Sequence, residues 1–363
     1  MEFSLSKQDY AYETLKDRIL SGAYRYLHRF PPEPELADAL KISRGTLRPA
    51  LKRLESEGYV SGIRKNGTFV VYRRGGAERG RIVYLIEPNA GVESPSSYIL
   101  PGVIDKAREL DHELVFCETD FFFSDLEDSS AVAAKFAGAA GMIFCPYATV
   151  FTGEVIERLD AAGVPVALYG DCGGGGMLSV RTDYKAAWND AIAYLSARGH
   201  TRIASIMGRD LQARGLSSLE EHKQLLLANG ASPDDNLIRV APYDKAQVKN
   251  AVKDIIAACG GVLPDVFLCF SDFYAIHVYE ALRELKINIP DDVSVMGFCG
   301  YPGSAFLSPP LTTVDIDYFA KGAAIVELLL DQGKGRTGNS IFVKHKIVLR
   351  GSVCTRKNCL AAG

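Results

Sequence analysis

The stretch from Ser43 to Tyr59 most restricts what this chain folds into, because it predicts an amphipathic helix with cations at its start. Ser43 is a good N-cap, since its side-chain oxygen accepts a hydrogen bond from a free backbone N–H of the first turn. Leu47, Leu51 and Leu54 recur at spacings of four and three and predict one buried face. The polar side chains on the outward face are then Arg44, Thr46, Arg48 and Lys52.

The neighbouring segments decide between a DNA-recognition helix and a solvated one. A first helix is predicted to end near Gly22, and a second begins at Pro34 and leads into a three-residue turn, which is helix-turn-helix spacing. Downstream, two β-prone runs flank Asn66-Gly67, a dipeptide that favours tight hairpins and predicts a two-stranded wing. A helix in the major groove needs donors on its first turns, because phosphate oxygens and guanine edges are acceptors. We interpret residues 1–72 as an α+β winged helix-turn-helix domain that binds DNA.

Three motifs stand in this segment: Phe30-Pro31-Pro32-Glu33, Ser43-Arg44-x-Thr46-x-Arg48 and Asn66-Gly67-Thr68-Phe69-Val70. Together they resemble the winged-helix domain of the GntR family of bacterial transcription regulators. Two departures are Pro32, where the family usually has serine, and Pro49 inside the helix, where a proline removes a backbone hydrogen bond and can kink the helix. The resemblance implies DNA contacts by the recognition helix and the wing, and the residues predicted to make them are Glu33, Ser43, Arg44, Thr46, Arg48, Lys52, Arg64, Lys65, Asn66 and Gly67.

Charge is distributed unevenly along the chain. Residues 1–80 hold 15 lysines and arginines against 10 carboxylates, net +5, and the remainder holds 26 against 34, net −8. This asymmetry suits a module that neutralises phosphates joined to one that does not touch nucleic acid. A length of 363 residues with 47% hydrophobic content predicts two or three ordered domains. Neither a signal peptide nor an apolar run of about 18 residues is present, so we expect a cytoplasmic protein without membrane contact.

Catalytic and metal sites are not indicated. The eight cysteines form no Cys-x-x-Cys pair, which predicts reduced thiols and neither a disulfide framework nor a metal site. His200 lies beside Arg198, but no nucleophile or second carboxylate is near it in sequence, so a structural role is favoured. The glycine run 173–176 lacks the lysine and the hydroxyl residue of a phosphate loop. We expect no enzymatic activity, no catalytic residue and no cofactor.

Residues 73–80 are polar and glycine-rich and predict a flexible linker. After them, short apolar runs alternate with helix-length stretches, which predicts a two-lobed α/β domain with parallel, doubly wound sheets covered on both faces. Ligands of such sheets bind at the carboxyl ends of the strands. The predicted strands are Ile82–Ile86, Leu114–Cys117, Gly141–Cys145, Val164–Leu168, Ile203–Met207, Val266–Phe270 and Val293–Phe298.

Aromatic rings, carboxylates and arginine side chains follow these runs. The mixture fits a polyhydroxylated ligand, because carboxylates accept from hydroxyls and an aromatic face stacks on the C–H face of a sugar. For any one of them the alternative is a polar residue placed where the chain turns into solvent. The candidates are Asn89, Tyr147, Asp171, Arg214 (or Arg209), Tyr243, Asp272 and Tyr301.

A second set of motifs spans residues 81–353: Gly141-Met142-Ile143-Phe144, Gly163-Val164-Pro165-Val166, Arg198-Gly199-His200-x-Arg202-Ile203-Ala204, Ser271-Asp272, Ile289-Pro290-Asp291-Asp292-Val293 and Pro309-Pro310-Leu311-Thr312-Thr313-Val314. These resemble the ligand-binding domain of the LacI/GalR regulators, which is similar to periplasmic sugar-binding proteins. The resemblance implies two lobes in residues 81–355, joined by crossings near 183, 311 and 335, with an effector in the cleft. Lobe 1 then covers about 81–183 and 312–334, lobe 2 about 184–311 and 335–355, and 356–363 form a tail.

The resemblance also adds Tyr98 and Asp183 to the candidate effector site, because they stand where the family has effector contacts or residues that support the cleft. Ser218 stands where the family usually has a cleft arginine, a role in which Arg214 could substitute, and Cys299-Gly300 stand where Asp-Asp is common. A familiar sugar specificity is therefore not implied.

The leading hypothesis is a transcription repressor that responds to a sugar-like effector. A homodimer would place two winged helices on operator half-sites about 34 Å apart, or a multiple of that. A GntR-like head on a LacI-like sensor resembles the arabinose-repressor type of hybrid. Two alternatives remain: a sugar-metabolising enzyme with a DNA-binding appendage, since fold does not determine function, and a constitutive DNA-binding protein whose pocket is vestigial, which Ser218 and Cys299 favour.

Overall fold

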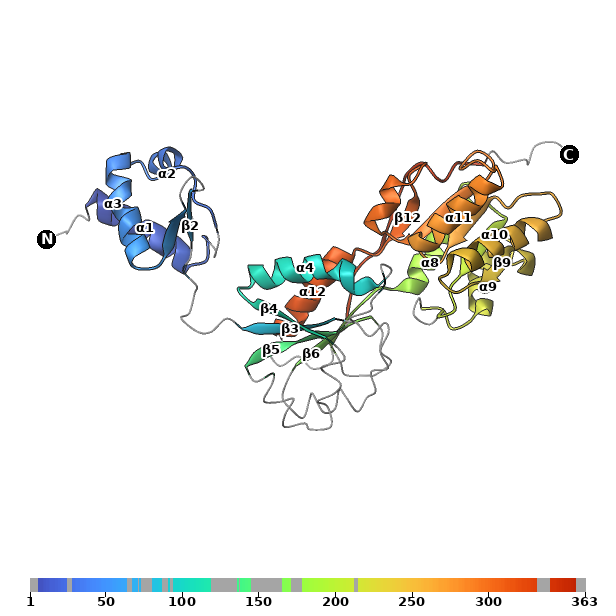
Figure 1. Ribbon diagram of the computed structural model, residues 1–363, viewed down its shortest axis with the longest axis horizontal. Helices are drawn as coiled ribbons and strands as arrows, with labels where there is room; N and C mark the ends of the chain where they lie inside the picture. Colours follow the sequence, from blue (N-terminus) through green and yellow to red (C-terminus); the bar gives the residue numbers. More distant parts are fainter. Residues whose placement is uncertain are drawn as a thin grey trace. The chain divides into compact units, whose positions relative to one another are not determined.

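The chain forms two compact units, the first made mainly of residues 1–81 and the second of the residues after them. Figure 1 shows the helices and strands of both units in a computed structural model. The residues that the structure describes are 6–24, 28–63, 67–70, 72, 80–86, 91, 94–118, 136, 138–144, 165–170, 178–211, 215–331 and 340–356.

The first unit is a three-helix domain with a β-hairpin, as predicted. Its core is made of apolar side chains from every element, among them Tyr12, Leu36 and Val70. Arg29 pairs with Phe69 of β2 through an isolated antiparallel β-bridge, a feature that the sequence did not predict. The elements are α1 (Lys7–Leu20), α2 (Glu33–Ala39), α3 (Arg44–Ser56), β1 (Val60–Ile63) and β2 (Gly67–Val70), with β1 and β2 antiparallel.

Helix α3 begins as its sequence predicts. Ser43 Oγ accepts a hydrogen bond from Thr46 N at 3.2 Å, and the predicted leucines of the inward face are buried. The helix continues without interruption through Pro49, so the proline does not end it.

The first sheet of the second unit has the strand order β13-β7-β6-β5-β3-β4. Its pairs β5–β6, β6–β7 and β7–β13 are parallel. The members are β3 (Arg81–Ile86), β4 (Glu113–Glu118), β5 (Ala139–Phe144), β6 (Val166–Tyr169), β7 (Leu178–Arg181) and β13 (Ser340–Phe342).

The predicted strand Leu114–Cys117 forms, but its predicted burial is wrong. Strand β4 is at the edge of the sheet, and Phe116 is 48% exposed. An edge strand has a neighbour on one side only, so its apolar run does not need cover on both faces.

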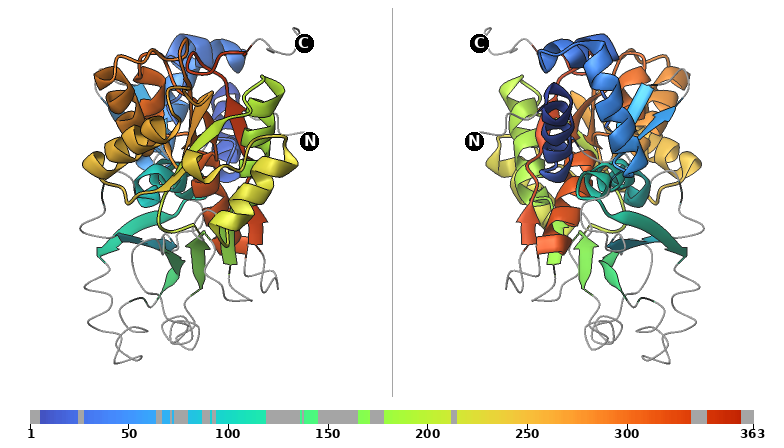
Figure 2. Two further views of the ribbon diagram at one scale, coloured as in Figure 1. Left: turned by 90° about the vertical axis from the view of Figure 1, so that its right-hand side faces the viewer. Right: turned by 90° about the vertical axis from the view of Figure 1, so that its left-hand side faces the viewer.

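Helices α4 (Pro95–Glu109) and α12 (Tyr318–Leu330) lie side by side next to this sheet (Figures 1 and 2). Their backbones touch at two glycines. A Cβ added at Gly322 would lie 2.0 Å from Ile99 O, and one added at Gly102 would lie 2.0 Å from Phe319 O. Only glycine permits such an approach.

The second sheet has the order β14-β12-β11-β10-β8-β9, and its central strands are buried throughout, as predicted. Four of its pairs are parallel, but β12–β14 is antiparallel, which the prediction of purely parallel sheets did not include. The strands are β8 (Ile203–Met207), β9 (Ile238–Val240), β10 (Val266–Cys269), β11 (Ser294–Cys299), β12 (Thr312–Asp315) and β14 (Lys346–Val348). The helices are α8 (Tyr184–Ala197), α9 (Leu219–Ala228), α10 (Lys245–Ala258), α11 (Asp272–Glu284) and the short η2 (Asp235–Leu237) and η3 (Pro302–Phe306).

Among the described residues the chain passes between the two sheets three times, and two of the predicted positions need correction. The first crossing, at 182–183, follows β7 as expected. The second lies at 316–317 instead of 311, because residues 312–315 form β12 of the second sheet. The third lies at 343–345 instead of 335, because residues 340–342 form β13 of the first sheet. Both strands are short, and their sequences do not stand out as apolar runs.

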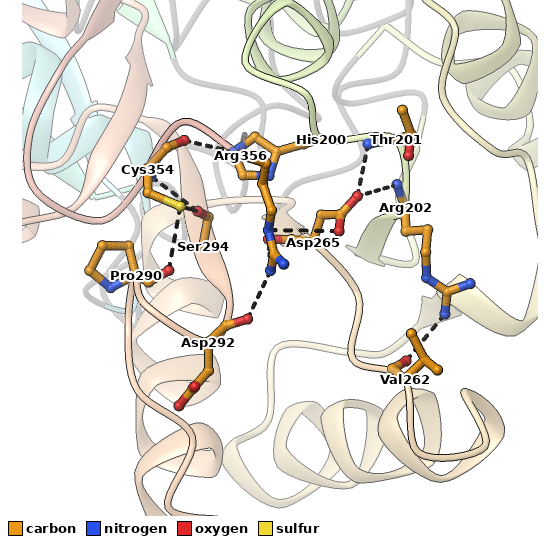
Figure 3. Close-up of polar contacts among 10 residues, drawn as sticks. All are labelled: His200, Thr201, Arg202, Val262, Asp265, Pro290, Asp292, Ser294, Cys354 and Arg356. Carbon is orange, nitrogen blue, oxygen red and sulfur yellow. Dashed lines mark hydrogen bonds and ion pairs between the residues drawn. The ribbon is translucent and has the colours of Figure 1, made fainter. Parts of the chain in front are cut away.

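The segment after β14 is fastened to the second sheet by His200 (Figure 3). This side chain is 0% exposed, and its Nε2–H donates to Cys354 O at 2.9 Å. Burial lowers the pKa of His200, which favours the neutral ring and a structural role. Arg356 N donates to Arg198 O at 2.8 Å, so Arg356 belongs to the domain and not to the predicted tail 356–363, whose other residues lie outside the described part of the chain.

Candidate functional site

The first candidate site is the outward face of α3. Arg44, Arg48 and Lys52 are exposed there, and Thr46 is half-buried behind the cap of Ser43. Gly67 is exposed at the start of β2. The predicted wing residues Arg64, Lys65 and Asn66 lie outside the described residues.

Glu33, at the start of α2, forms an ion pair with Arg48. Glu33 Oε2 accepts from Arg48 Nε at 2.9 Å, and both side chains are exposed. The carboxylate holds the guanidinium by its inner nitrogen, whereas bidentate recognition of a guanine edge or a phosphate uses a fork of two nitrogens. Glu33 is therefore placed to orient Arg48 on the surface that the recognition helix presents.

Another arginine of α3, Arg53, has a different environment. Its guanidinium carbon lies 3.7 Å from the centre of the Tyr12 ring, and its Nε donates to Glu57 Oε1 at 3.0 Å. Glu57 also accepts from Tyr12 Oη, and this bond is the main cause that lowers the pKa of Glu57. These contacts tie α3 to α1 and stabilise the head.

The second candidate site is an aromatic cluster in the second unit. The ring centre of Tyr301 lies 4.4 Å from those of Tyr98 and Phe273 and 5.5 Å from that of Tyr318. The cluster extends from Tyr318 to Tyr169 and from Phe273 to Tyr243. Its members lie beside both sheets. Tyr169 ends β6, Tyr243 and Tyr301 follow β9 and β11, and the other three are in the first turns of α4, α11 and α12. The aromatic cluster is Tyr98, Tyr169, Tyr243, Phe273, Tyr301 and Tyr318.

Some rings of the aromatic cluster are buried and others are accessible to solvent. Tyr169, Tyr301 and Tyr318 are buried, whereas Tyr243 is 38% exposed and Tyr98 is half-buried. The structure thus brings together Tyr98, Tyr243 and Tyr301, three of the residues that the sequence predicted for effector binding.

Asp272 adjoins the cluster but does not face solvent. It is 2% exposed, its Oδ2 accepts from Tyr301 N at 2.8 Å and its Oδ1 accepts from Thr313 Oγ1 at 2.5 Å. Burial raises the pKa of Asp272 to about 7, against the lowering effect of the Thr313 hydroxyl. In this structure the carboxylate fixes the loop that carries Tyr301.

Two other predicted effector residues serve as helix caps. Asp183 Oδ1 accepts from Ala186 N at 2.9 Å at the start of α8, and Ser218 Oγ accepts from Glu221 N at 3.2 Å at the start of α9. Both side chains are exposed. The remaining candidates, Asn89, Tyr147, Asp171 and Arg214, lie outside the described residues.

Lys321 of α12 was not predicted, although it is 1% exposed and borders Tyr169 and Tyr318. Helical spacing contained the signal. Residues 318, 321, 322 and 325 recur at the spacing of one helix face and all four are buried, so a lysine at 321 faces the interior. This helix was not predicted as part of the site, because the strand β12 before it has only four residues and does not stand out as an apolar run.

Two family models match the chain. The model described as bacterial regulatory proteins, gntR family, matches residues 7–70, and the model described as a periplasmic binding protein-like domain matches residues 192–353.

None of the described helices is both long and apolar enough to cross a membrane.

Individual relatives have low sequence identity to this chain and are named as transcriptional regulators. The chain is 28% identical over 187 residues to the HTH-type transcriptional repressor MelR of Bacillus subtilis, and the aligned stretch covers 50% of this chain and 52% of that protein. It is 29% identical over 285 residues to the HTH-type transcriptional regulator MalR of Streptomyces coelicolor, and the aligned stretch covers 76% of this chain and 81% of that protein. The fold resembles that of a transcriptional regulator CelR–cellobiose complex, with a TM-score of 0.62 and 20% identity over 89% of this chain and all of that one.

Proposed function

Because the chain joins a DNA-binding domain of the gntR family of bacterial regulatory proteins to a periplasmic binding protein-like domain, we propose that it is a transcription repressor controlled by a small polar effector. The observation that carries the proposal is this union of a cationic recognition helix with a second unit whose strand ends converge on aromatic rings.

The DNA-binding part of the proposal depends on α3. Its capped N-terminus presents Arg44 and Arg48 on an exposed face, where guanidinium groups pair with phosphates and guanine edges. The hairpin β1–β2 follows the helix and supplies a second contact to the duplex. We assign direct contacts to Arg44, Thr46, Arg48 and Lys52, and to the wing residues Arg64, Lys65, Asn66 and Gly67. Glu33 and Ser43 position the first of these groups.

The effector part depends on the aromatic cluster, where strand ends of both sheets meet. Aromatic rings stack on the C–H faces of sugars, and the solved CelR structure contains cellobiose. We assign the effector contacts to Tyr98, Tyr243 and Tyr301, together with the predicted residues Asn89, Tyr147, Asp171, Asp183, Arg214 and Ser218. Asp272 acts on the effector through the position of Tyr301.

A homodimer completes the proposal. A single head of this size reaches one half-site, and half-sites about 34 Å apart, or a multiple of that, require two heads.

Selection of duplexes from a random pool by the full-length protein tests this function. We expect enrichment of a sequence with two-fold related halves and a binding constant that falls steeply as salt rises. Enrichment of no sequence, with an affinity equal for all duplexes, would contradict sequence-specific regulation.

A further inference from the structure

The segment that precedes α2 lies against β2, on the side of that strand that β1 leaves open. Arg29 pairs with Phe69 of β2 through the antiparallel β-bridge, and two backbone hydrogen bonds of 2.8 and 3.0 Å flank the bridge. The backbone of Arg29 is therefore fixed to the hairpin β1–β2, although it is far from the hairpin in sequence.

The side chain of Arg29 points away from the core of the head. Phe30, the next residue, is 4% exposed and belongs to that core, whereas Arg29 is exposed. Successive side chains of an extended segment point to opposite faces. Arg29 therefore lies on the outer face of the hairpin, which it shares with Phe69 and Ser61 through their pairing.

Gly67, at the start of β2, provides the space in which the guanidinium of Arg29 lies. A Cβ added at Gly67 would lie 3.1 Å from Arg29 Nε and 3.6 Å from its Nη2. The φ of Gly67 is +100°, a conformation that other residues rarely adopt. Arg29 thus takes the place of a side chain at the end of the hairpin where β1 turns into β2.

The contacts of Arg29 differ from those of other arginines of the head. Arg48 pairs with Glu33, and Arg18 donates to Tyr24 Oη at 3.0 Å. Within the described part of the chain, the side chain of Arg29 has no hydrogen bond or ion pair of this kind. Its N–H donors are therefore available to an acceptor outside the protein.

Arg29 also gives the hairpin a positive charge that its own strands lack. The strands β1 and β2 contain neither lysine nor arginine. A guanidinium presents a planar fork of donors that matches the oxygens of a phosphate, and it stays charged at physiological pH. The outer face of the hairpin is thereby suited to the sugar-phosphate backbone of a duplex.

Resting on the DNA-binding function proposed above, we propose that Arg29 is a phosphate contact of the hairpin, which adds affinity for every duplex and does not read its sequence. Phosphate contacts fix the register and orientation of a protein on DNA but carry no sequence information themselves. Arg48, which Glu33 orients, has the complementary task of discriminating between duplexes.

Anisotropy titrations of the full-length protein over a range of salt concentrations test the contact, with the selected duplex and a scrambled one. Arg29→Gln removes the charge, and Arg29→Lys keeps it. We expect Arg29→Gln to weaken binding to both duplexes by the same factor, roughly fivefold, and to lower the slope of log affinity against log salt by about 0.9. Arg29→Lys should keep the slope of the wild type.

Two further variants complete the experiment. Lys253→Gln removes one exposed charge of α10 in the second unit and should change neither affinity nor slope. Arg29→Ala repeats the measurement with a shorter side chain, in case glutamine disturbs the β-bridge. Melting temperatures show that each variant is folded before its affinity is compared.

The outcomes separate this inference from the proposed function. Unchanged affinity and slope in Arg29→Gln and Arg29→Ala, with normal binding by the wild type, overturn the contact and leave DNA binding standing. A loss confined to the selected duplex also overturns it, because Arg29 would then read bases. A wild type that binds neither duplex counts against the DNA-binding function itself, and the contact falls with it.

Discussion

Asp272 Oδ2 accepts the backbone N–H of Tyr301 at 2.8 Å, so a buried carboxylate at the start of α11 fixes the aromatic residue that follows β11. Tyr301 in turn contacts Tyr98 and Tyr318, which belong to helices beside the other sheet. One hydrogen bond of the second sheet thereby sets the position of a ring on which both sheets converge. An effector that bound as proposed and moved this ring would therefore act on elements beside both sheets.

The raised pKa of Asp272, about 7 against 3.8 for the free side chain, makes stability depend on pH. Between those values the folded protein binds a proton that the unfolded chain has lost, so the free energy of unfolding falls as pH rises towards 7. Asp272→Asn removes this dependence. Between pH 5 and 7 we expect the free energy of unfolding of the wild type to fall by roughly 2 kcal/mol relative to that of the variant.

Urea unfolding of both proteins at several pH values measures this difference. The comparison at each pH is necessary because burial lowers the pKa of His222 to about 4, which gives stability the opposite slope below pH 6.5. Wild-type and variant curves that stay parallel from pH 5 to 8 would show that Asp272 is ionised throughout.

Arg44→Ala and Arg48→Ala are expected to weaken binding to the selected duplex by about 1–3 kcal/mol each, because each removes a guanidinium from the exposed face of α3. Melting temperature should change little, since neither side chain is in the core. Fluorescence anisotropy measures the affinity, with Lys253→Ala as a control cation in the second unit. Equal losses for the control and the α3 variants would refute the assignment of the recognition helix.

Glu33→Gln removes the negative charge that holds Arg48 at its Nε. We expect tighter binding to unrelated duplexes, because a carboxylate beside the phosphates is repulsive, and a smaller ratio of specific to non-specific affinity, because Arg48 is less constrained. The measurement is anisotropy on the selected duplex and on a scrambled one. An unchanged ratio would mean that the ion pair does not orient Arg48 for recognition.

Gly322→Ala should destabilise the second unit by several kcal/mol, because its Cβ would lie 2.0 Å from Ile99 O and force α4 away from α12. Gly303→Ala is the matched control, since a Cβ there has no atom within 4 Å. Calorimetry of both variants checks the pair. Similar melting temperatures for the two would contradict the close contact of the helices.

Local patterns in the sequence predicted the head well. The cap at Ser43, the leucine spacing of α3 and the hairpin all formed as expected, because each depends on neighbours within a few residues. The bridge between Arg29 and Phe69 was missed, since it joins segments 40 residues apart and leaves no periodic signal.

The sequence predicted the fold class of the second unit but not all of its strands or the positions of its crossings. Its long apolar strands gave the two sheets, whereas β12 and β13 are too short to stand out, and two crossings were therefore misplaced. Because ligands bind at the carboxyl ends of parallel strands, the sequence predicted Tyr243 and Tyr301 for one site, and both are in the aromatic cluster. The sequence did not indicate that Asp272 is buried, because its partners, Tyr301 N after β11 and Thr313 of β12, come near it only in the folded sheet.

The central claim is that a ligand of the second unit controls the DNA affinity of the first. Anisotropy titrations of the selected duplex, without and with a saturating sugar that raises the melting temperature, measure this coupling directly. We expect the dissociation constant to change by roughly 5- to 150-fold, and the duplex to change the affinity for the sugar by the same factor. A dissociation constant that is the same with and without every such sugar would contradict effector control and leave a constitutive DNA-binding protein.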